Sequence, residues 1–315
     1  MTSPHLTLTD IQVYLPSFRP SIEQVIEDIK EDGVSFRLSA AEYRDSGFAQ
    51  VPIAQDESLE QMINRVCVPI LSRAREEGIR LGAILFACVT NPGVQAQSLF
   101  SGLLHEFAYG DTPVIQTEEY GCAALHLSLY LAKAYLAVEP GSNAAVLFVA
   151  ADRAISSHHR SDSYMLYGDA ASAALLRKSG PGGQQTLADR LKVDALVYDD
   201  SPERIKMYFS TFYLAVRQVV KQVLRDAGMS MGEIRLIFCS NLGLNTWSTL
   251  ARAIGCPLDK FYAGALEYAG HLHNTDILLN VNDAIQADSL KRGDFYLTVT
   301  VGFGGYYGCS LHKYE

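Results

Sequence analysis

The sequence has little of several features that mark particular protein classes. Its 315 residues include 26 lysines and arginines against 35 aspartates and glutamates, a formal net charge of −9, and no block of five basic residues. We therefore expect no nucleic-acid partner. The longest apolar stretches, such as 144–151, reach about half of the roughly 20 residues that cross a bilayer. No basic segment leads into an apolar one at the N-terminus, so we expect a cytoplasmic protein without a membrane partner.

Cysteine is also sparse, and no two cysteines form a C-x-x-C pair. The sequence therefore predicts neither a bound metal nor a disulfide framework. A single cysteine in such a chain is most simply a small buried apolar residue. The six positions are Cys67, Cys88, Cys122, Cys239, Cys256 and Cys309.

Apolar residues make up 48% of the chain and charged residues 19%, the balance of a globular protein. Short β-type runs alternate with longer segments of helical period, which predicts an α/β fold with a mainly parallel sheet. Strands are expected at 83–89, 113–117, 144–150, 171–176, 236–239, 295–301 and 307–312. Helices are expected at 58–76, 95–107, 123–138, 207–227, 245–254 and 276–286.

A Gly-, Pro- and Ser-containing stretch, KSGPGGQQ at 178–185, predicts a join between two halves. Residues 1–180 would form an N-terminal half that carries Cys122. Residues 181–315 would form a C-terminal half that carries His271 and Asp276. Both halves show the same α/β alternation, which suggests a structural duplication without a residue-level repeat.

Cys122 follows an extended run and an acidic pair in PVIQTEEYGCAALHLSLY, where Gly121-Cys122 opens a helical segment. In the first turn of that helix, unpaired N–H groups and the helix dipole would favour a thiolate, the form that a cysteine nucleophile needs. From these residues alone, a buried structural cysteine is an equal alternative, because small residues after a glycine also suit tight packing.

Three further segments set the context: YGDAASAAL at 167–175, GHLHNTDILLN at 270–280 and VGFGGYYGCS at 301–310. With the Gly-Cys-Ala-Ala turn, their order and spacing resemble the ketosynthase III branch of the thiolase-like superfamily over nearly the whole chain. The resemblance implies two pseudo-duplicated α/β halves layered as an αβαβα sandwich, and a homodimer. It also implies Cys122 as nucleophile and an oxyanion hole made by the N–H groups of Cys122 and Gly304, with Gly305 as the alternative donor.

The sequence departs from a decarboxylating ketosynthase III, which carries a histidine after a strand in its second half. Ser240 stands at that position, and this disfavours carbon–carbon bond formation. The later segment is similar to the Gly-His-x-x-x-x-Asp segment of a subgroup that transfers acyl groups to oxygen or nitrogen through a Cys-His-Asp arrangement. An acceptor hydroxyl or amine must lose a proton as it attacks, so a general base is required. By this resemblance His271 is the base and Asp276 orients it.

Alternatives stay open at three positions. His273 would be the base if the loop were displaced. Asp276 would serve equally as the N-cap of the following helix, and the two roles are compatible. Asn274 would match the asparagine of condensing enzymes, which would favour condensation.

The resemblance implies an acyltransferase of specialised metabolism. It would take an acyl group from acyl-coenzyme A or an acyl carrier protein onto Cys122 and pass it to an alcohol or amine acceptor. No cofactor would stay bound, because coenzyme A or phosphopantetheine enters with the donor. Two alternatives remain: a condensing or chain-initiating ketosynthase III that uses a malonyl thioester, and a non-catalytic partner subunit of a ketosynthase-like heterodimer.

Overall fold

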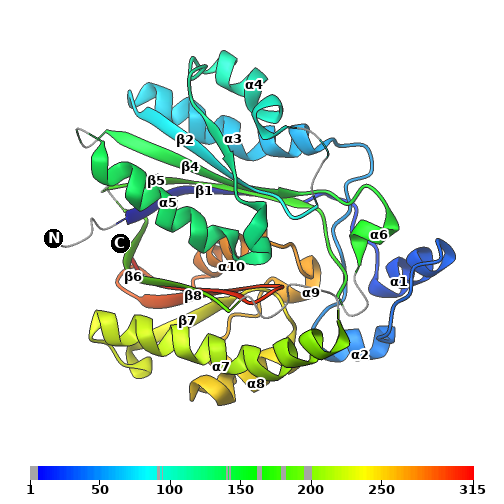
Figure 1. The fold of residues 1–315 in the computed structure, drawn as a ribbon. Helices are drawn as coiled ribbons and strands as arrows, with labels where there is room; N and C mark the ends of the chain where they lie inside the picture. The colour runs from blue at the N-terminus through cyan, green and yellow to red at the C-terminus, as the bar shows by residue number, and fades with distance from the viewer. Residues whose placement is uncertain are drawn as a thin grey trace.

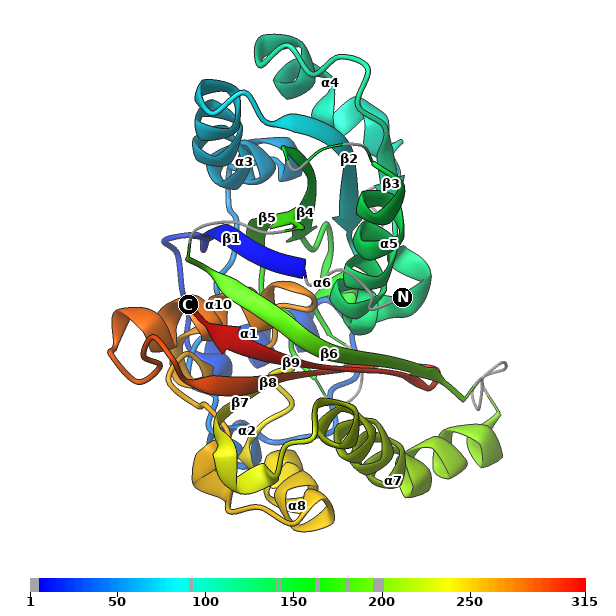
Figure 2. The same cartoon turned by 90° about the vertical axis from the view of Figure 1, so that its left-hand side faces the viewer.

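The computed structural model describes residues 6–90, 93, 95–139, 141, 143–161, 165–178, 182–194 and 201–315. Within these residues, nine strands are hydrogen-bonded in the order β3-β2-β4-β5-β1-β6-β9-β8-β7. Strand β1 (Leu6–Tyr14) connects two groups of strands within this order, because it pairs antiparallel with β5 (Ala170–Arg177) on one side and with the start of β6 (Gln184–Val193) on the other. Figure 2 shows β1 and β6 side by side at this junction.

The first group of strands holds the parallel pairs of the N-terminal half. Strand β2 (Arg80–Ala87) lies between β3 (Val114–Gln116) and β4 (Ala144–Asp152), parallel to both. Helices α3 (Leu59–Glu76) and α4 (Ala96–Glu106) cover its outer face (Figure 1). Side chains from these helices and strands form one apolar cluster, so the helices bury the outer face of this group of strands.

The second group repeats the arrangement with fewer strands. Strand β7 (Ile234–Cys239) runs parallel to β8 (Phe295–Gly302), and β9 (Tyr306–Tyr314) lies antiparallel between β8 and β6. Helices α7 (Pro202–Ala227) and α8 (Leu244–Ile254) cover the outer face on this side (Figure 1).

Helices α5 (Ala124–Val138) and α10 (Thr275–Gln286) lie between the two groups of strands (Figure 1). Their buried residues share one apolar cluster with β1, β2, β4 and β8. The layers are therefore helix, sheet, helix, sheet, helix, and the expected αβαβα sandwich is confirmed. This middle layer matters for function, because each half sends one helix start into the centre of the molecule.

One stretch in the described helices, Glu118–Val138, is long and apolar enough to cross a bilayer by length and composition. It consists of the turn η1 (Glu118–Ala123) and α5, which lies in the middle layer. Core helices of globular proteins meet the same two criteria.

The sequence predictions missed some elements. Strands β1 and β6 were not expected, because their Thr, Asp and Gln residues interrupt the apolar pattern. Short helices also went unpredicted: α1 (Ile22–Glu31), α2 (Ala40–Asp45), α6 (Ser157–Arg160), α9 (Leu266–Ala269) and the turns η2 (Met231–Glu233) and η3 (Leu258–Lys260). The predicted boundary between residues 180 and 181 lies outside the described residues and stays a prediction.

Candidate active site

Cys122 lies in η1, the 3₁₀ turn directly before α5. The prediction that Cys122 belongs to the first turn of the long helix needs this correction, since α5 begins at Ala124. The physical reason is the backbone of Gly121, which adopts φ 48° and ψ −133° and breaks the helical path. Such a conformation favours glycine. The Cys122 side chain remains partly exposed, whereas four of the other five cysteines are buried, and all six are free thiols.

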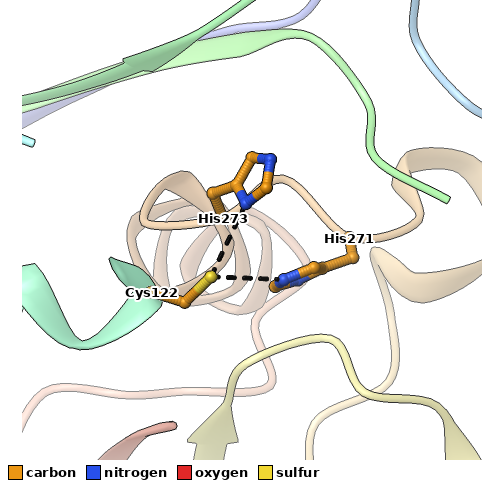
Figure 3. A group of neighbouring side chains, drawn as sticks. All are labelled: Cys122, His271 and His273. Atoms are coloured by element: carbon orange, nitrogen blue, oxygen red, sulfur yellow. Dashed lines mark hydrogen bonds between the residues drawn. The ribbon is translucent and has the colours of Figure 1, made fainter. Parts of the chain in front are cut away.

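Two histidines contact the Cys122 sulfur (Figure 3). The Sγ atom lies 3.5 Å from Nε2 of His271 and 3.6 Å from Nδ1 of His273. Both rings are buried and come from the loop between α9 and α10. His273 has φ 54°, a left-handed backbone conformation that is uncommon for residues other than glycine. The fold therefore brings a cysteine of the first half against two histidines of the second.

Asp276 completes a chain of contacts that begins at the sulfur. Its Oδ2 atom lies 2.5 Å from Nδ1 of His271, and its side chain is fully buried in the first turn of α10. It also accepts hydrogen bonds from the backbone N–H groups of Asn241 and Leu272, each at 2.7 Å. The helix N-cap is Asn274, so the alternative that Asp276 is the N-cap is wrong. The carboxylate is held by three donors and fixes the His271 ring.

Asn241 is a positioning residue that the sequence analysis did not single out. Besides its N–H bond to Asp276, its side-chain amide donates to the Gly270 carbonyl at 2.7 Å and accepts from Asn280 at 2.9 Å. The neighbouring Ser240 is buried, and its carbonyl accepts from the Trp247 indole N–H at 3.0 Å. The sequence signal that could have found Asn241 is the polar pair Ser240-Asn241 directly after the apolar strand β7.

The side-chain amide nitrogen of Asn274 points to a backbone carbonyl and not to the Cys122 sulfur. That nitrogen donates to the Gly121 carbonyl at 2.9 Å and so ties the histidine loop to the cysteine turn. The side chain is buried, and its Oδ1 atom has no hydrogen-bond partner among the described residues. Asn274 thus sets the relative position of the two loops that carry the candidate site.

The electrostatics of the cluster favour an ionised sulfur. Burial by itself would raise the pKa of Cys122, but the charges and hydrogen bonds of His271 and His273 outweigh burial and lower that pKa to about 7. Burial would lower the pKa of His271, yet Asp276 and Cys122 hold it well above its usual value. The pKa of His273 is also raised against burial, by the charge of Asp152 and by Cys122. A thiolate beside an imidazolium is therefore accessible near neutral pH.

The glycine-rich turn between β8 and β9 lies against the cysteine turn. A Cβ added to Gly302 would clash with the Tyr120 carbonyl oxygen, so the two backbones approach as closely as glycine permits. Gly304 and Gly305 each have φ 99°. The Gly305 carbonyl accepts from the Asp194 N–H at 2.9 Å. That the N–H groups of Cys122 and Gly304 form an oxyanion hole stays a prediction.

Two aromatic side chains that the sequence analysis did not single out border the cluster. The Tyr167 ring lies 4.4 Å from the His273 ring and 5.6 Å from that of His271, measured between centroids. On the other side, Tyr208 of α7 is buried, and burial, with Tyr307 and Cys122, raises its pKa. Tyr208 also contacts Phe303 edge-on at 5.3 Å.

Comparisons with known proteins agree with this architecture. The family model described as 3-oxoacyl-[acyl-carrier-protein (ACP)] synthase III C terminal matches residues 224–314. The β-ketoacyl-[acyl-carrier-protein] synthase III of Aquifex aeolicus (strain VF5) is 23% identical over 324 residues, which cover 96% of this chain and 97% of that protein. The matched segment 224–314 contains His271, His273 and Asp276.

Solved structures extend the likeness to the whole fold. One is named ChlB3 and described as an acyltransferase; its TM-score is 0.81 at 20% identity, over 99% of this chain and 98% of that one. Another is the priming β-ketosynthase of the R1128 polyketide pathway, with a TM-score of 0.76 at 20% identity, over 98% and 96%. At these identities the structures establish the fold. Together with the family match over residues 224–314, they show that this chain is similar to ketosynthase III proteins and has their thiolase-like fold.

Proposed function

We propose that the protein is an acyltransferase that carries the acyl group on Cys122 and passes it to an alcohol or an amine. The observation that carries the proposal is the position of His271, whose two ring nitrogens contact the Cys122 sulfur at 3.5 Å and the Asp276 carboxylate at 2.5 Å. This is the geometry of a base that an acid residue orients. Ser240 stands where a condensing enzyme would need its histidine, which also favours transfer to oxygen or nitrogen.

The proposed reaction has two steps that share one proton carrier. In the first, the Cys122 thiolate attacks the thioester carbonyl, the carbon–sulfur bond to the donor breaks, and the departing thiolate takes a proton from His271. In the second, His271 removes a proton from the acceptor hydroxyl or amine, which attacks the acyl carbonyl and releases Cys122. The N–H groups of Cys122 and Gly304 would stabilise the oxyanion in both steps.

The donor in this proposal is acyl-coenzyme A or an acyl carrier protein, so no cofactor needs to stay bound. The names of the similar synthases support a carrier-protein donor. The net charge of −9 works against the docking of an acidic carrier protein unless a local basic patch is present. A homodimer and a role in specialised metabolism belong to the same proposal and rest on the resemblance alone, and a cytoplasmic location rests on the sequence pattern.

A second candidate function, condensation with a malonyl thioester, is favoured by His273. Its Nδ1 atom lies 3.6 Å from the sulfur, so two imidazoles face the sulfur, and condensation needs two polar groups to stabilise the enolate carbonyl. The relatives named as synthases and as a priming ketosynthase favour the same chemistry.

Intact-mass measurement separates these functions. The protein and its Cys122→Ala variant would be mixed with acyl and malonyl thioesters on coenzyme A and on a carrier protein. The proposal expects a mass gain of one acyl group that the variant lacks. It also expects His271→Ala to load slowly and to discharge the acyl group to no acceptor. Release of carbon dioxide from a malonyl thioester would favour condensation instead. No mass gain with any donor would favour the non-catalytic partner subunit.

A further inference from the structure

The candidate nucleophile and the two histidines beside it present one metal-binding atom each. These are Sγ of Cys122, Nε2 of His271 and Nδ1 of His273, and all three atoms lie within 4.8 Å of one another (Figure 3). Thiolate and imidazole together are donors for Zn²⁺ and Co²⁺, whereas Mg²⁺ and Ca²⁺ prefer oxygen. We propose that these three residues, called the Cys122 cluster below, bind a divalent cation of the zinc class, which blocks acyl loading.

The distances within the cluster support this inference. Zinc bonds of about 2.3 Å to sulfur and 2.0–2.1 Å to nitrogen, at a tetrahedral angle, place sulfur and nitrogen about 3.5 Å apart. The two sulfur–nitrogen distances are 3.5 and 3.6 Å. The two nitrogens, within 4.8 Å of each other, would need to lie about 3.4 Å apart. Two sides of the ligand triangle thus have the required length, and the third needs a closure of at most about 1.4 Å.

The outer contacts of the cluster are those of a metal site. A histidine that binds a metal usually donates its other ring N–H to a carboxylate, which fixes its orientation and raises its basicity. His271 has this partner in Asp276 at 2.5 Å, and Asp276 is itself held by the N–H groups of Asn241 and Leu272. The nitrogen that faces the sulfur is therefore held ready to bind a cation.

His273 and Cys122 leave room for the ion to enter. The hydrogen bonding of the His273 ring among the described residues is confined to the Cys122 sulfur, so no other polar group holds it back from an ion. Cys122 is partly exposed as a residue, which gives an ion a route from solvent to the cluster. Three protein ligands would leave a fourth position open for water, as in catalytic zinc sites.

This inference deepens the proposed function and partly rests on it. The sulfur that would accept the acyl group and the ring that would carry the proton are both ligands, so the ion and the acyl group exclude each other. Binding also requires a deprotonated sulfur and free imidazole nitrogens.

The first test is a titration of the chelator-treated protein with Co²⁺, followed by the thiolate-to-cobalt charge-transfer absorbance. We expect one Co²⁺ per chain, displaced by Zn²⁺. Cys122→Ser should abolish the band. His273→Ala should weaken binding at least about 100-fold, since loss of an outer partner alone costs 10–100-fold. His273→Gln serves as a second variant if the alanine variant does not fold. Cys256→Ser removes the other partly exposed cysteine and should change nothing.

The second test measures how fast iodoacetamide alkylates Cys122 with and without Zn²⁺, which needs no acyl donor. Zinc should protect the wild type and Cys256→Ser at least tenfold, and should not protect the His273 variants. The inference is overturned if the cobalt band persists in Cys122→Ser, if the His273 variants bind cobalt as the wild type does, or if saturating zinc leaves alkylation unchanged. If zinc binds as expected and no thioester acylates Cys122, the metal site stands and the proposed function fails.

Discussion

Replacing His271 with alanine tests the electrostatics on which both proposals depend. Burial acts to raise the pKa of Cys122, yet the two histidines lower it from 9.0 to about 7. A shift of two units corresponds to about 2.7 kcal/mol in favour of the thiolate. His271 is the largest of the influences that lower this pKa, and without it only His273 opposes burial. We expect the pKa of Cys122 to rise by about 1–2 units in His271→Ala.

The assay is the rate of alkylation by iodoacetamide between pH 5 and 10, in a Cys256→Ser background that removes the other partly exposed thiol. The wild-type rate should have its midpoint near pH 7, and the His271→Ala rate near pH 8–9. At pH 7 the thiolate fraction would fall from about one half to about 1–10%. A more basic thiolate is also more nucleophilic, so the rate itself falls only about two- to sixfold. The midpoint is therefore the sharper measurement.

The control for this experiment is His105→Ala, because His105 is exposed on α4 and not part of the cluster. Its midpoint should equal that of the wild type. His273→Ala should give a smaller upward shift than His271→Ala. A midpoint that stays near pH 7 in a folded His271→Ala protein would show that His271 does not set the ionisation of Cys122, and the reasoning above would be refuted.

Three other perturbations have defined outcomes. Asp276→Asn should still load an acyl group but slow its transfer to the acceptor at least about 100-fold, because the base loses its orienting carboxylate, as single-turnover kinetics would record. Gly302→Ala should lower the free energy of unfolding by about 1–3 kcal/mol, because the added Cβ would meet a carbonyl oxygen of η1. Gly102→Ala, in open space on α4, should raise the free energy of unfolding by about 0.5–1 kcal/mol. Urea unfolding compares the two variants, and equal effects would contradict the packing argument. Burial lowers the pKa of both His126 and His312 from 6.5 to about 3, so each stays neutral in the folded chain while it gains a proton in the unfolded one. This contribution to the free energy of unfolding should be fully present above pH 6.5 and be lost as the pH drops toward 3, by up to about 4–5 kcal/mol for each histidine. Unfolding measured at several pH values should show a shallower decline of the free energy in His126→Gln. An unchanged slope would show that the buried histidines do not cause the decline.

Much of the fold was predictable because local patterns and tertiary packing agree. The runs that became β4, β5 and β8 are mostly apolar and almost entirely buried, as strands between two layers of helices must be, and their positions were predicted within a few residues. Strands β1 and β6 were missed for the opposite reason. They carry polar residues at the junction of the two sheet halves, so their pairing depends on partners far away in the chain.

The candidate site also has a part that could be predicted from the sequence and a part that could not. The residues by themselves marked Cys122 only as a candidate, because a cysteine after a glycine at a helix start also suits a structural role. The resemblance to ketosynthase III proteins then implied Cys122, His271 and Asp276. The resemblance assigned the base to His271 and left His273 as the alternative if the short loop that carries both were displaced. Tertiary structure placed both rings against one sulfur, at 3.5 and 3.6 Å, and gave only His271 the carboxylate.

The metal-binding geometry was beyond the reach of cysteine spacing altogether. Spacing rules detect ligands that lie close in the chain, whereas here Cys122 comes from the first half and both histidines come from the second. Local sequence patterns were enough to predict the α/β alternation, to mark residues able to do the chemistry and to support the family resemblance. Which of those residues meet depends on the packing of two helix starts in the middle layer, because that packing sets the distance between a sulfur and an imidazole.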